Sequence, residues 1–144
     1  MTGSGWINPI AGIISSGFGE RINPITNQLE MHAGIDIAAP IDTVVLATTN
    51  GLVHETGSSA LNGRYINIET DEGYMIIYAH LNKINVKKMQ YVERGEVIGL
   101  SGNTGRSSGP HLHYGVYKDD EPLDPAGFLR VKYEPEIPAY VLAD

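Results

Sequence analysis

Short runs of alternating apolar and polar residues, separated by turn-forming residues, make up most of this chain. Runs 44–47 and 52–56 flank Asn50-Gly51, a dipeptide that favours tight hairpin turns. Runs 65–70 and 74–80 flank the turn-forming sequence Asp71-Glu72-Gly73. The pattern therefore predicts two β-hairpins.

Two further runs, 96–100 and 112–117, are predicted as short strands. The candidate helix at 81–90 is weakened by Ile84-Asn85-Val86, which have low helix propensity. The predicted fold class is therefore all-β, with antiparallel sheets and few or no helices.

Segments 23–30 and 101–110 are rich in polar and turn-forming residues and are predicted loops. A length of 144 residues fits one domain with a single core. We expect one domain over 1–144, with its core at about 15–130 and a tail or linker at 131–144.

Composition narrows the chemistry and the partners. Because there is no cysteine, any metal has to be held by histidine and carboxylate. The net charge of −7 argues against nucleic acid or an anionic membrane as a partner held by charge. No run approaches the roughly 18 apolar residues of a membrane span, and residues 1–6 lack the basic start of a signal peptide.

Four of the five histidines lie in three short strings: His32-x-x-x-Asp36, Tyr78-Ala-His80 and His111-x-His113. In a strand, His111 and His113 project from the same face, about 7 Å apart at the backbone. His80 lies in an apolar strand, where a buried imidazole needs a polar or metal partner. If the strings converge, they offer two imidazoles and a carboxylate to a metal, plus two imidazoles for acid–base work. This inventory suits a zinc hydrolase.

The spacing of His32 and Asp36 imposes a structural condition. An extended chain separates residues at this spacing by about 13 Å, too far to share one ion. We therefore predict a bend at Ala33-Gly34, where glycine permits it.

Six strings carry a resemblance to a known family. They are Gly17-Phe-Gly-Glu-Arg21, His32-x-x-x-Asp36, Tyr78-Ala-His-Leu81, Glu93-Arg-Gly-Glu-Val-Ile-Gly99, Gly102-Asn-Thr-Gly105 and Gly109-Pro-His-Leu-His-Tyr114. In this set and order, from about Gly17 to Leu129, the chain resembles the lysostaphin/LytM-like zinc endopeptidases, which cut peptide bridges of bacterial peptidoglycan.

The resemblance implies a division of labour among the site residues. His32, Asp36 and His113 correspond to the three protein ligands of one Zn²⁺ per chain, in a groove above one sheet. His111 corresponds to the general base, and His80 to its companion, which orients water or stabilises the oxyanion. The glycine-rich loop at 102–109 is expected to form one wall of the groove.

The function that we expect is zinc-dependent cleavage of stem or bridge peptides in peptidoglycan. We expect the protein to act outside the cytoplasm. It would be either a secreted or periplasmic autolysin, or the wall-penetrating domain of a phage tail in the virion. Other domains or phage tail proteins are the expected partners. The alternative is a non-catalytic regulator or structural module of the same fold.

Four further residues have more than one interpretation, and a fifth departs from the family pattern. Asn23 occupies a loop from which some relatives supply an inhibitory zinc contact, but Asn-Pro favours a simple turn. Arg21 either lines the cleft or pairs with a carboxylate, and Tyr78 either donates a hydrogen bond in the groove or belongs to the core. His54 is expected to be structural or solvent-facing, and Gly115 stands where many relatives carry Glu.

Overall fold

Strands dominate the structure, a computed structural model that describes residues 5–23 and 25–129. Within these residues the only helix is one 3-10 turn, η1 (Pro125–Phe128). The strands are β1 (Ile13–Ser16), β2 (Gly19–Ile22), β3 (Leu29–His32), β4 (Ile35–Ala38), β5 (Val44–Leu46), β6 (Gly51–Ser59), β7 (Gly63–Thr70), β8 (Met75–Ile84), β9 (Tyr91–Val92), β10 (Val97–Ser101), β11 (His111–Lys118) and β12 (Glu121–Leu123).

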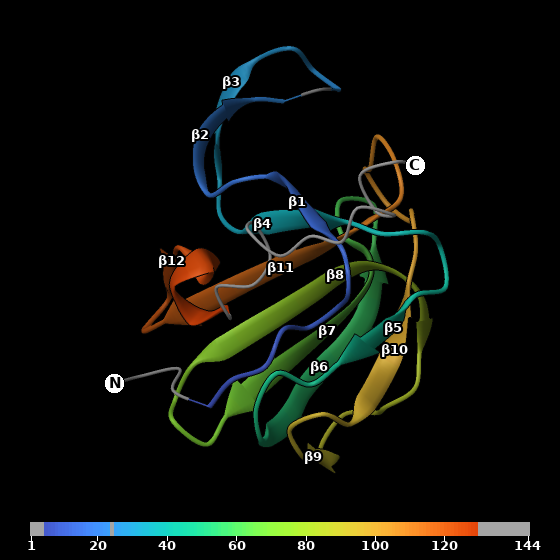
Figure 1. Ribbon diagram of the computed structural model, residues 1–144, viewed down its shortest axis with the longest axis vertical. Helices are drawn as coiled ribbons and strands as arrows, with labels where there is room; N and C mark the ends of the chain where they lie inside the picture. The colour runs from blue at the N-terminus through green and yellow to red at the C-terminus, as the bar shows by residue number, and fades with distance from the viewer. Residues whose placement is uncertain (1–4, 24, 130–144) are drawn as a thin grey trace.

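One large antiparallel sheet contains ten of these strands (Figure 1). Its main path runs β1-β4-β11-β8-β7-β6-β9, with β10 beside β8 and β5, and β12 beside β11. β2 and β3 form a separate hairpin, which projects at the top of Figure 1. The predicted all-β, antiparallel fold class is confirmed. The predicted tail at 131–144 lies outside the described residues.

Alternation along the central strands gives the sheet two different faces. On β11, Leu112, Tyr114 and Val116 are fully buried in the hydrophobic core, whereas His111 and His113 point to the other face. On β4, Ile35 and Ile37 likewise lie in the core, on either side of the partly exposed Asp36. Full burial of one such aliphatic side chain contributes about 1.5–3 kcal/mol. The core therefore holds the strands that present polar groups on the opposite face.

Tyr78 belongs to the core, so its alternative placement in the groove is wrong. Its hydroxyl oxygen accepts a hydrogen bond from the Thr48 backbone N–H at 3.1 Å, and the Tyr114 hydroxyl donates to Thr48 Oγ1 at 3.1 Å. Burial raises the pKa of Tyr78 to about 12, so the phenol keeps its proton. The two tyrosines bury their rings and satisfy their hydroxyls on one threonine.

The predicted hairpin at 65–80 is confirmed, because β7 and β8 pair across the turn at 71–73. The hairpin predicted around Asn50-Gly51 is wrong, since β5 pairs with β10 and β6 pairs with β7 and β9. Gly51 lies inside β6, where a Cβ would come within 2.5 Å of the Glu69 carbonyl oxygen. The glycine thus permits a close approach of strands instead of a turn. Asn50 uses its side-chain oxygen to accept from the Arg94 backbone N–H.

The run at 81–90 is not a helix. Strand β8 continues through Leu81 to Ile84, and the chain then turns towards β9. No helix among the described residues is both long and apolar enough to cross a membrane.

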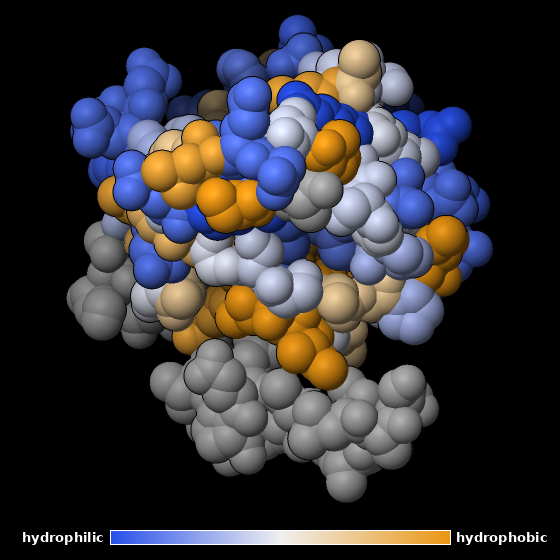
Figure 2. Space-filling model, turned by 90° about the horizontal axis from the view of Figure 1, so that it is seen from above, coloured by the Kyte–Doolittle hydropathy of each residue, from blue (hydrophilic) through white to orange (hydrophobic). Residues whose placement is uncertain are grey.

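The β2–β3 hairpin has a polar face with Arg21 and Glu30, and an opposite face on which Glu20 stands among Ile22, Leu29 and Met31. Arg21 lies opposite Glu30 across the two strands, and Ile22 lies opposite Leu29. Because residues alternate along a strand, these two pairs point to opposite faces. Figure 2 looks onto this end of the molecule, where hydrophobic and hydrophilic residues are interspersed. The polar pair lines a groove above the sheet.

The predicted bend at Ala33-Gly34 is confirmed. β3 ends at His32 in the small sheet, and β4 begins at Ile35 in the large one. A Cβ at Gly34 would lie 2.7 Å from the Tyr114 carbonyl oxygen and 2.8 Å from Cε1 of His113. Glycine is required here because the chain passes directly against β11.

We expect Gly34→Ala to destabilise the protein by about 1–3 kcal/mol, since the methyl group meets backbone that cannot move aside. Urea unfolding followed by circular dichroism measures this loss. Gly127→Ala is the matched control, because a Cβ there meets nothing within 4 Å. Equal stability of the two variants would contradict the proposed packing constraint at Gly34.

Candidate metal centre

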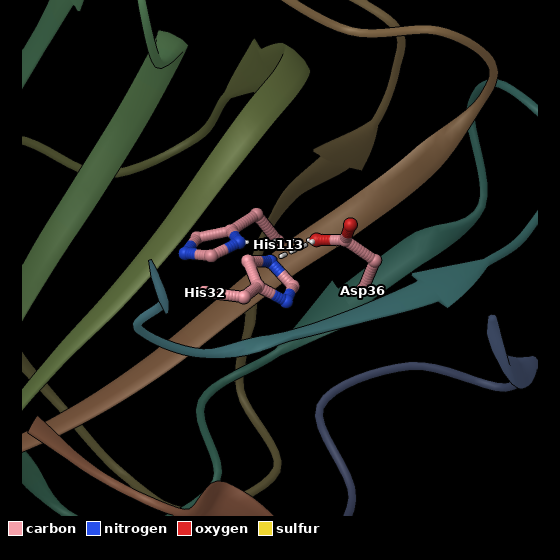
Figure 3. Close-up of side chains that lie close together, drawn as sticks. All are labelled: His32, Asp36 and His113. Carbon is pink, nitrogen blue, oxygen red and sulfur yellow. Dashed lines mark hydrogen bonds and ion pairs between the residues drawn. The ribbon is translucent and has the colours of Figure 1, made fainter. Parts of the chain in front are cut away.

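His32, Asp36 and His113 converge on one point above the sheet (Figure 3). Their candidate ligand atoms all lie within 4.8 Å of one another. Asp36 Oδ1 is 3.2 Å from His32 Nε2 and 3.0 Å from His113 Nδ1. The register of β4 on β11 places Asp36 directly opposite His113, and the bend at Gly34 returns His32 to the same point.

Backbone carbonyls hold three of the four histidines in one tautomer. His32 Nδ1 lies 2.8 Å from the Gly17 oxygen, His80 Nδ1 lies 2.7 Å from the Thr104 oxygen, and His111 Nδ1 lies 2.7 Å from the Gly109 oxygen. A carbonyl can only accept a hydrogen bond, so each Nδ1 carries the hydrogen. This leaves Nε2 as the ring nitrogen that each of the three can offer to a metal or a proton.

His113 uses its other ring nitrogen. Its Nδ1 lies 3.0 Å from Asp36 Oδ1, so Nδ1 is the ring nitrogen that faces the centre. Burial would raise the pKa of Asp36, but hydrogen bonds to His113 and His32 outweigh burial and hold it far below its usual range. Asp36 is therefore an anion at neutral pH, as a metal ligand has to be.

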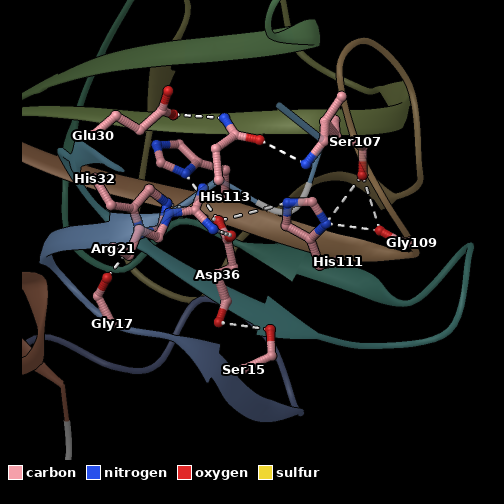
Figure 4. Close-up of polar contacts among 12 residues, drawn as sticks. Ser15, Gly17, Arg21, Glu30, His32, Asp36, Ser107, Gly109, His111 and His113 are labelled. Carbon is pink, nitrogen blue, oxygen red and sulfur yellow. Dashed lines mark hydrogen bonds and ion pairs between the residues drawn. The ribbon is translucent and has the colours of Figure 1, made fainter. Parts of the chain in front are cut away.

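His111 and His80 stand together beside these three residues (Figure 4 shows His111). His111 Nε2 is 3.5 Å from Asp36 Oδ1, and the ring centroids of His80 and His111 are 4.8 Å apart. Burial lowers the pKa of His80 to about 4, so its imidazole is neutral at pH 7. His80 has a positive φ of 63°, an uncommon conformation for a histidine.

The centre lies in an open groove of about 700 Å³. The polar face of the β2–β3 hairpin borders it on one side, and loop residues 106–110 border it on another. This placement confirms the prediction that the glycine-rich loop forms a groove wall.

The remaining sequence-predicted residues are also placed. His54 is exposed and takes no part in the cluster. Asn23 is a turn residue, since its Oδ1 accepts from the backbone N–H groups of Ile25 and Thr26 at 2.7 and 3.2 Å. Both interpretations of Arg21 hold, because it lines the groove and its Nη1 lies 3.9 Å from Asp36 Oδ2.

Sequence reasoning missed the groups that anchor the imidazoles. The Ser107 hydroxyl donates to the Gly109 oxygen at 2.9 Å and lies 3.1 Å from His111 Nδ1 (Figure 4). The other anchors are backbone carbonyls of Gly17 and Thr104, which no residue-type pattern reveals. The signals in the sequence are Gly17 and Gly19, around the start of the hairpin that carries His32, and the glycine-rich loop before His111.

The donor set fits a divalent first-row metal. Two neutral imidazole nitrogens and one ionised carboxylate are the ligands of an open, catalytic type of zinc site. The hydrogen bond from His32 to the Gly17 carbonyl fixes the orientation of the His32 ring.

Comparisons with known proteins agree with this geometry. Residues 30–125 match peptidase family M23. The chain is 46% identical over 112 residues to the peptidoglycan DD-endopeptidase ShyA of Vibrio cholerae, which covers 77% of this chain and 26% of ShyA.

Two solved structures have the same fold. A zinc-containing peptidase from Vibrio cholerae gives a TM-score of 0.75 at 38% identity, over 90% of this chain and 39% of that chain. The catalytic domain of lysostaphin from Staphylococcus simulans gives a TM-score of 0.74 at 34% identity, over 81% of this chain and 91% of that domain.

The match covers 26% of ShyA, so the chain spans only about a quarter of the length of this relative. It spans nearly all of the lysostaphin catalytic domain, to 91%. The family match covers more than half of the chain and includes His32, Asp36, His80, His111 and His113. The chain therefore belongs to peptidase family M23.

Proposed function

We propose that this chain is the catalytic domain of a zinc-dependent endopeptidase that cleaves peptide cross-links of bacterial peptidoglycan. The observation that carries the proposal is the convergence of four histidines and one aspartate at the floor of an open groove. Kinship with a peptidoglycan DD-endopeptidase supports the choice of substrate. The extent of the domain over 1–144 is part of the same proposal.

His32, Asp36 and His113 would hold the metal. When bound, Zn²⁺ supplies a Lewis acid that polarises an amide carbonyl and makes water more acidic. The pKa of Asp36, held low by its histidine partners, keeps the carboxylate ready to bind without first losing a proton.

His111 is the general base in this proposal. Its Nδ1–H is held by the Gly109 carbonyl, so Nε2 points its lone pair towards the centre. A base within hydrogen-bond reach of the attacking water, directly or through one further water, can take its proton and return it to the leaving amine.

His80 orients water in this proposal. Because the Thr104 carbonyl holds its Nδ1–H, Nε2 presents an acceptor and not a donor. A pKa near 4 keeps the imidazole neutral at pH 7. An acceptor suits a water hydrogen better than an oxyanion, so this tautomer favours the first of the two functions expected for His80.

A non-catalytic regulator of the same fold is the alternative. A regulator has no need of a base, a second imidazole and three ligands at one groove floor. Here the three candidate ligands, His111 and His80 all lie together at the groove floor, and this arrangement favours catalysis. Action outside the cytoplasm, as an autolysin or in a phage virion, follows from a peptidoglycan substrate and belongs to the proposal.

The purified, zinc-loaded chain should release soluble muropeptides from isolated cell walls, and a chelator should stop this release until zinc returns. Mass spectrometry of digests from two wall chemotypes identifies the bond that is cleaved. Intact walls after incubation with the zinc-loaded chain would favour the regulator.

We expect His113→Ala to lower zinc affinity by more than about 100-fold, because loss of a ligand costs more than loss of a group that only hydrogen-bonds to a ligand. Metal content after dialysis, measured by plasma mass spectrometry, tests this. His54→Ala, which changes an exposed histidine outside the centre, should keep one zinc. Full zinc content in the first variant would remove His113 from the ligand set.

His111→Ala should keep one zinc and lose about 10²- to 10⁴-fold in kcat, the usual contribution of a general base. Metal content and turnover of a soluble cross-linked peptide are measured on the same preparation. Turnover at the wild-type rate would assign the base elsewhere.

A further inference from the structure

Arg21 is a cation beside the metal centre whose hydrogen-bonding groups are largely unused. Its Nη1 lies 3.9 Å from Asp36 Oδ2, beyond hydrogen-bond distance. Its Nε is buried and has no hydrogen-bond partner among the described residues. Buried donors are nearly always paired, so this N–H requires an explanation.

The obvious counter-ion of Arg21 is engaged elsewhere. Glu30 lies directly opposite Arg21 in the β2–β3 hairpin, the usual position for a cross-strand ion pair. Instead, the Glu30 carboxylate accepts from Asn23 Nδ2 at 2.6 Å. The turn hydrogen bonds of Asn23 to Ile25 and Thr26 fix this amide in place. Asn23 therefore holds Glu30 apart from the guanidinium.

The charges in the groove point to an anionic ligand. Four charged residues other than histidine line it: Arg21, Glu30, Asp36 and Arg106. Asp36 faces the centre and Glu30 faces Asn23, so no carboxylate among the described residues makes a hydrogen bond to either guanidinium group. Arg21 has only its longer ion pair of 3.9 Å with Asp36. A divalent metal at the centre adds positive charge, although the chain as a whole carries −7. An anion that binds Arg21 relieves this accumulation of charge.

We propose that Arg21 binds a free carboxylate of the substrate, carried by the residue that supplies the nitrogen of the scissile amide. The inference rests on the proposed function. A guanidinium forms a planar fork that matches a carboxylate with two parallel hydrogen bonds. Arg21 Nη1 lies 3.9 Å from Oδ2 of Asp36, a proposed ligand of the centre, which is about the length of one residue along an extended chain, roughly 3.5 Å. The carboxylate that it reaches therefore belongs to a residue at the scissile bond.

The position of this carboxylate follows from the chemistry of the amide. The residue on the carbonyl side has used its α-carboxyl group to form the bond. A free α-carboxylate thus belongs to the residue on the nitrogen side, where the chain ends or where a branched cross-link leaves that group free. The interior of a glycine bridge has no such carboxylate. Arg21 would therefore select branched or terminal amides over glycine bridges.

The test uses two synthetic cross-linked peptides that differ only in a carboxylate or a carboxamide on the nitrogen-side residue. We expect zinc-loaded wild type to cleave the carboxylate peptide with a kcat/KM about tenfold or more higher, as a charge-assisted hydrogen bond implies. Arg21→Gln should reduce this ratio to near one, and Arg21→Lys should leave it intermediate. General damage to the site lowers both rates and leaves the ratio unchanged.

The control is Arg94→Gln, which removes the same charge from a residue that binds the Gly5 carbonyl, outside the residues that line the groove. This variant should keep the wild-type ratio. A second readout avoids turnover: metal-free wild type, titrated with each peptide by NMR, should bind the carboxylate peptide more tightly, and Arg21→Gln should lose the difference.

Equal cleavage and equal binding of the two peptides by wild type would overturn the inference, as would a ratio unchanged in Arg21→Gln. Failure of wild type to cleave either peptide or any wall would instead reject the proposed function.

Discussion

The register of β4 on β11 is the constraint on which the site depends. It sets Asp36 opposite His113, so that one carboxylate oxygen lies 3.0 Å from an imidazole nitrogen of the neighbouring strand. A slip of one residue would turn Asp36 into the hydrophobic core and bring Ile35 or Ile37 to the groove face. The core prevents this slip, because both isoleucines are fully buried. Packing on one face of the sheet thereby fixes chemistry on the other.

Loops supply what the strands cannot, which is control over the protons of the imidazoles. The strands determine where His80 and His111 stand, but the carbonyls of Thr104 and Gly109 decide which nitrogen carries hydrogen. The same holds for His32 and the Gly17 carbonyl. These carbonyls come from turns, where backbone groups are not consumed by strand pairing. A glycine-rich loop around a sheet-borne site therefore has a chemical function besides lining the groove.

The β2–β3 hairpin adds a second level of organisation above the sheet. It carries His32 into the centre and also places Arg21 beside Asp36. The Asn23–Glu30 hydrogen bond engages the carboxylate that lies opposite Arg21 in the hairpin. An acidic chain thus keeps positive charge at the one place where an anionic substrate group would approach the proposed metal.

Much of this protein can be read from residue types and spacing. Alternation predicted an all-β fold, and it identified the 65–80 hairpin because its strands are neighbours in sequence. The 32–36 spacing demanded a bend at Gly34, and the structure has it. The convergence of His32, Asp36 and His113 could be expected from motif order, although only resemblance linked them.

Where distant strands meet, local patterns were insufficient. Asn50-Gly51 has the composition of a hairpin turn, yet long-range pairing with β7 and β9 placed Gly51 inside a strand. Tyr78 went to the core because Thr48, far away in sequence, satisfies its hydroxyl. The sequence by itself determined the strand content and the set of chemical groups. Only the tertiary structure decided the strand partners, the histidine tautomers and the groups that surround Arg21. Each of these depends on contacts between groups that are remote along the chain or that a turn brings together.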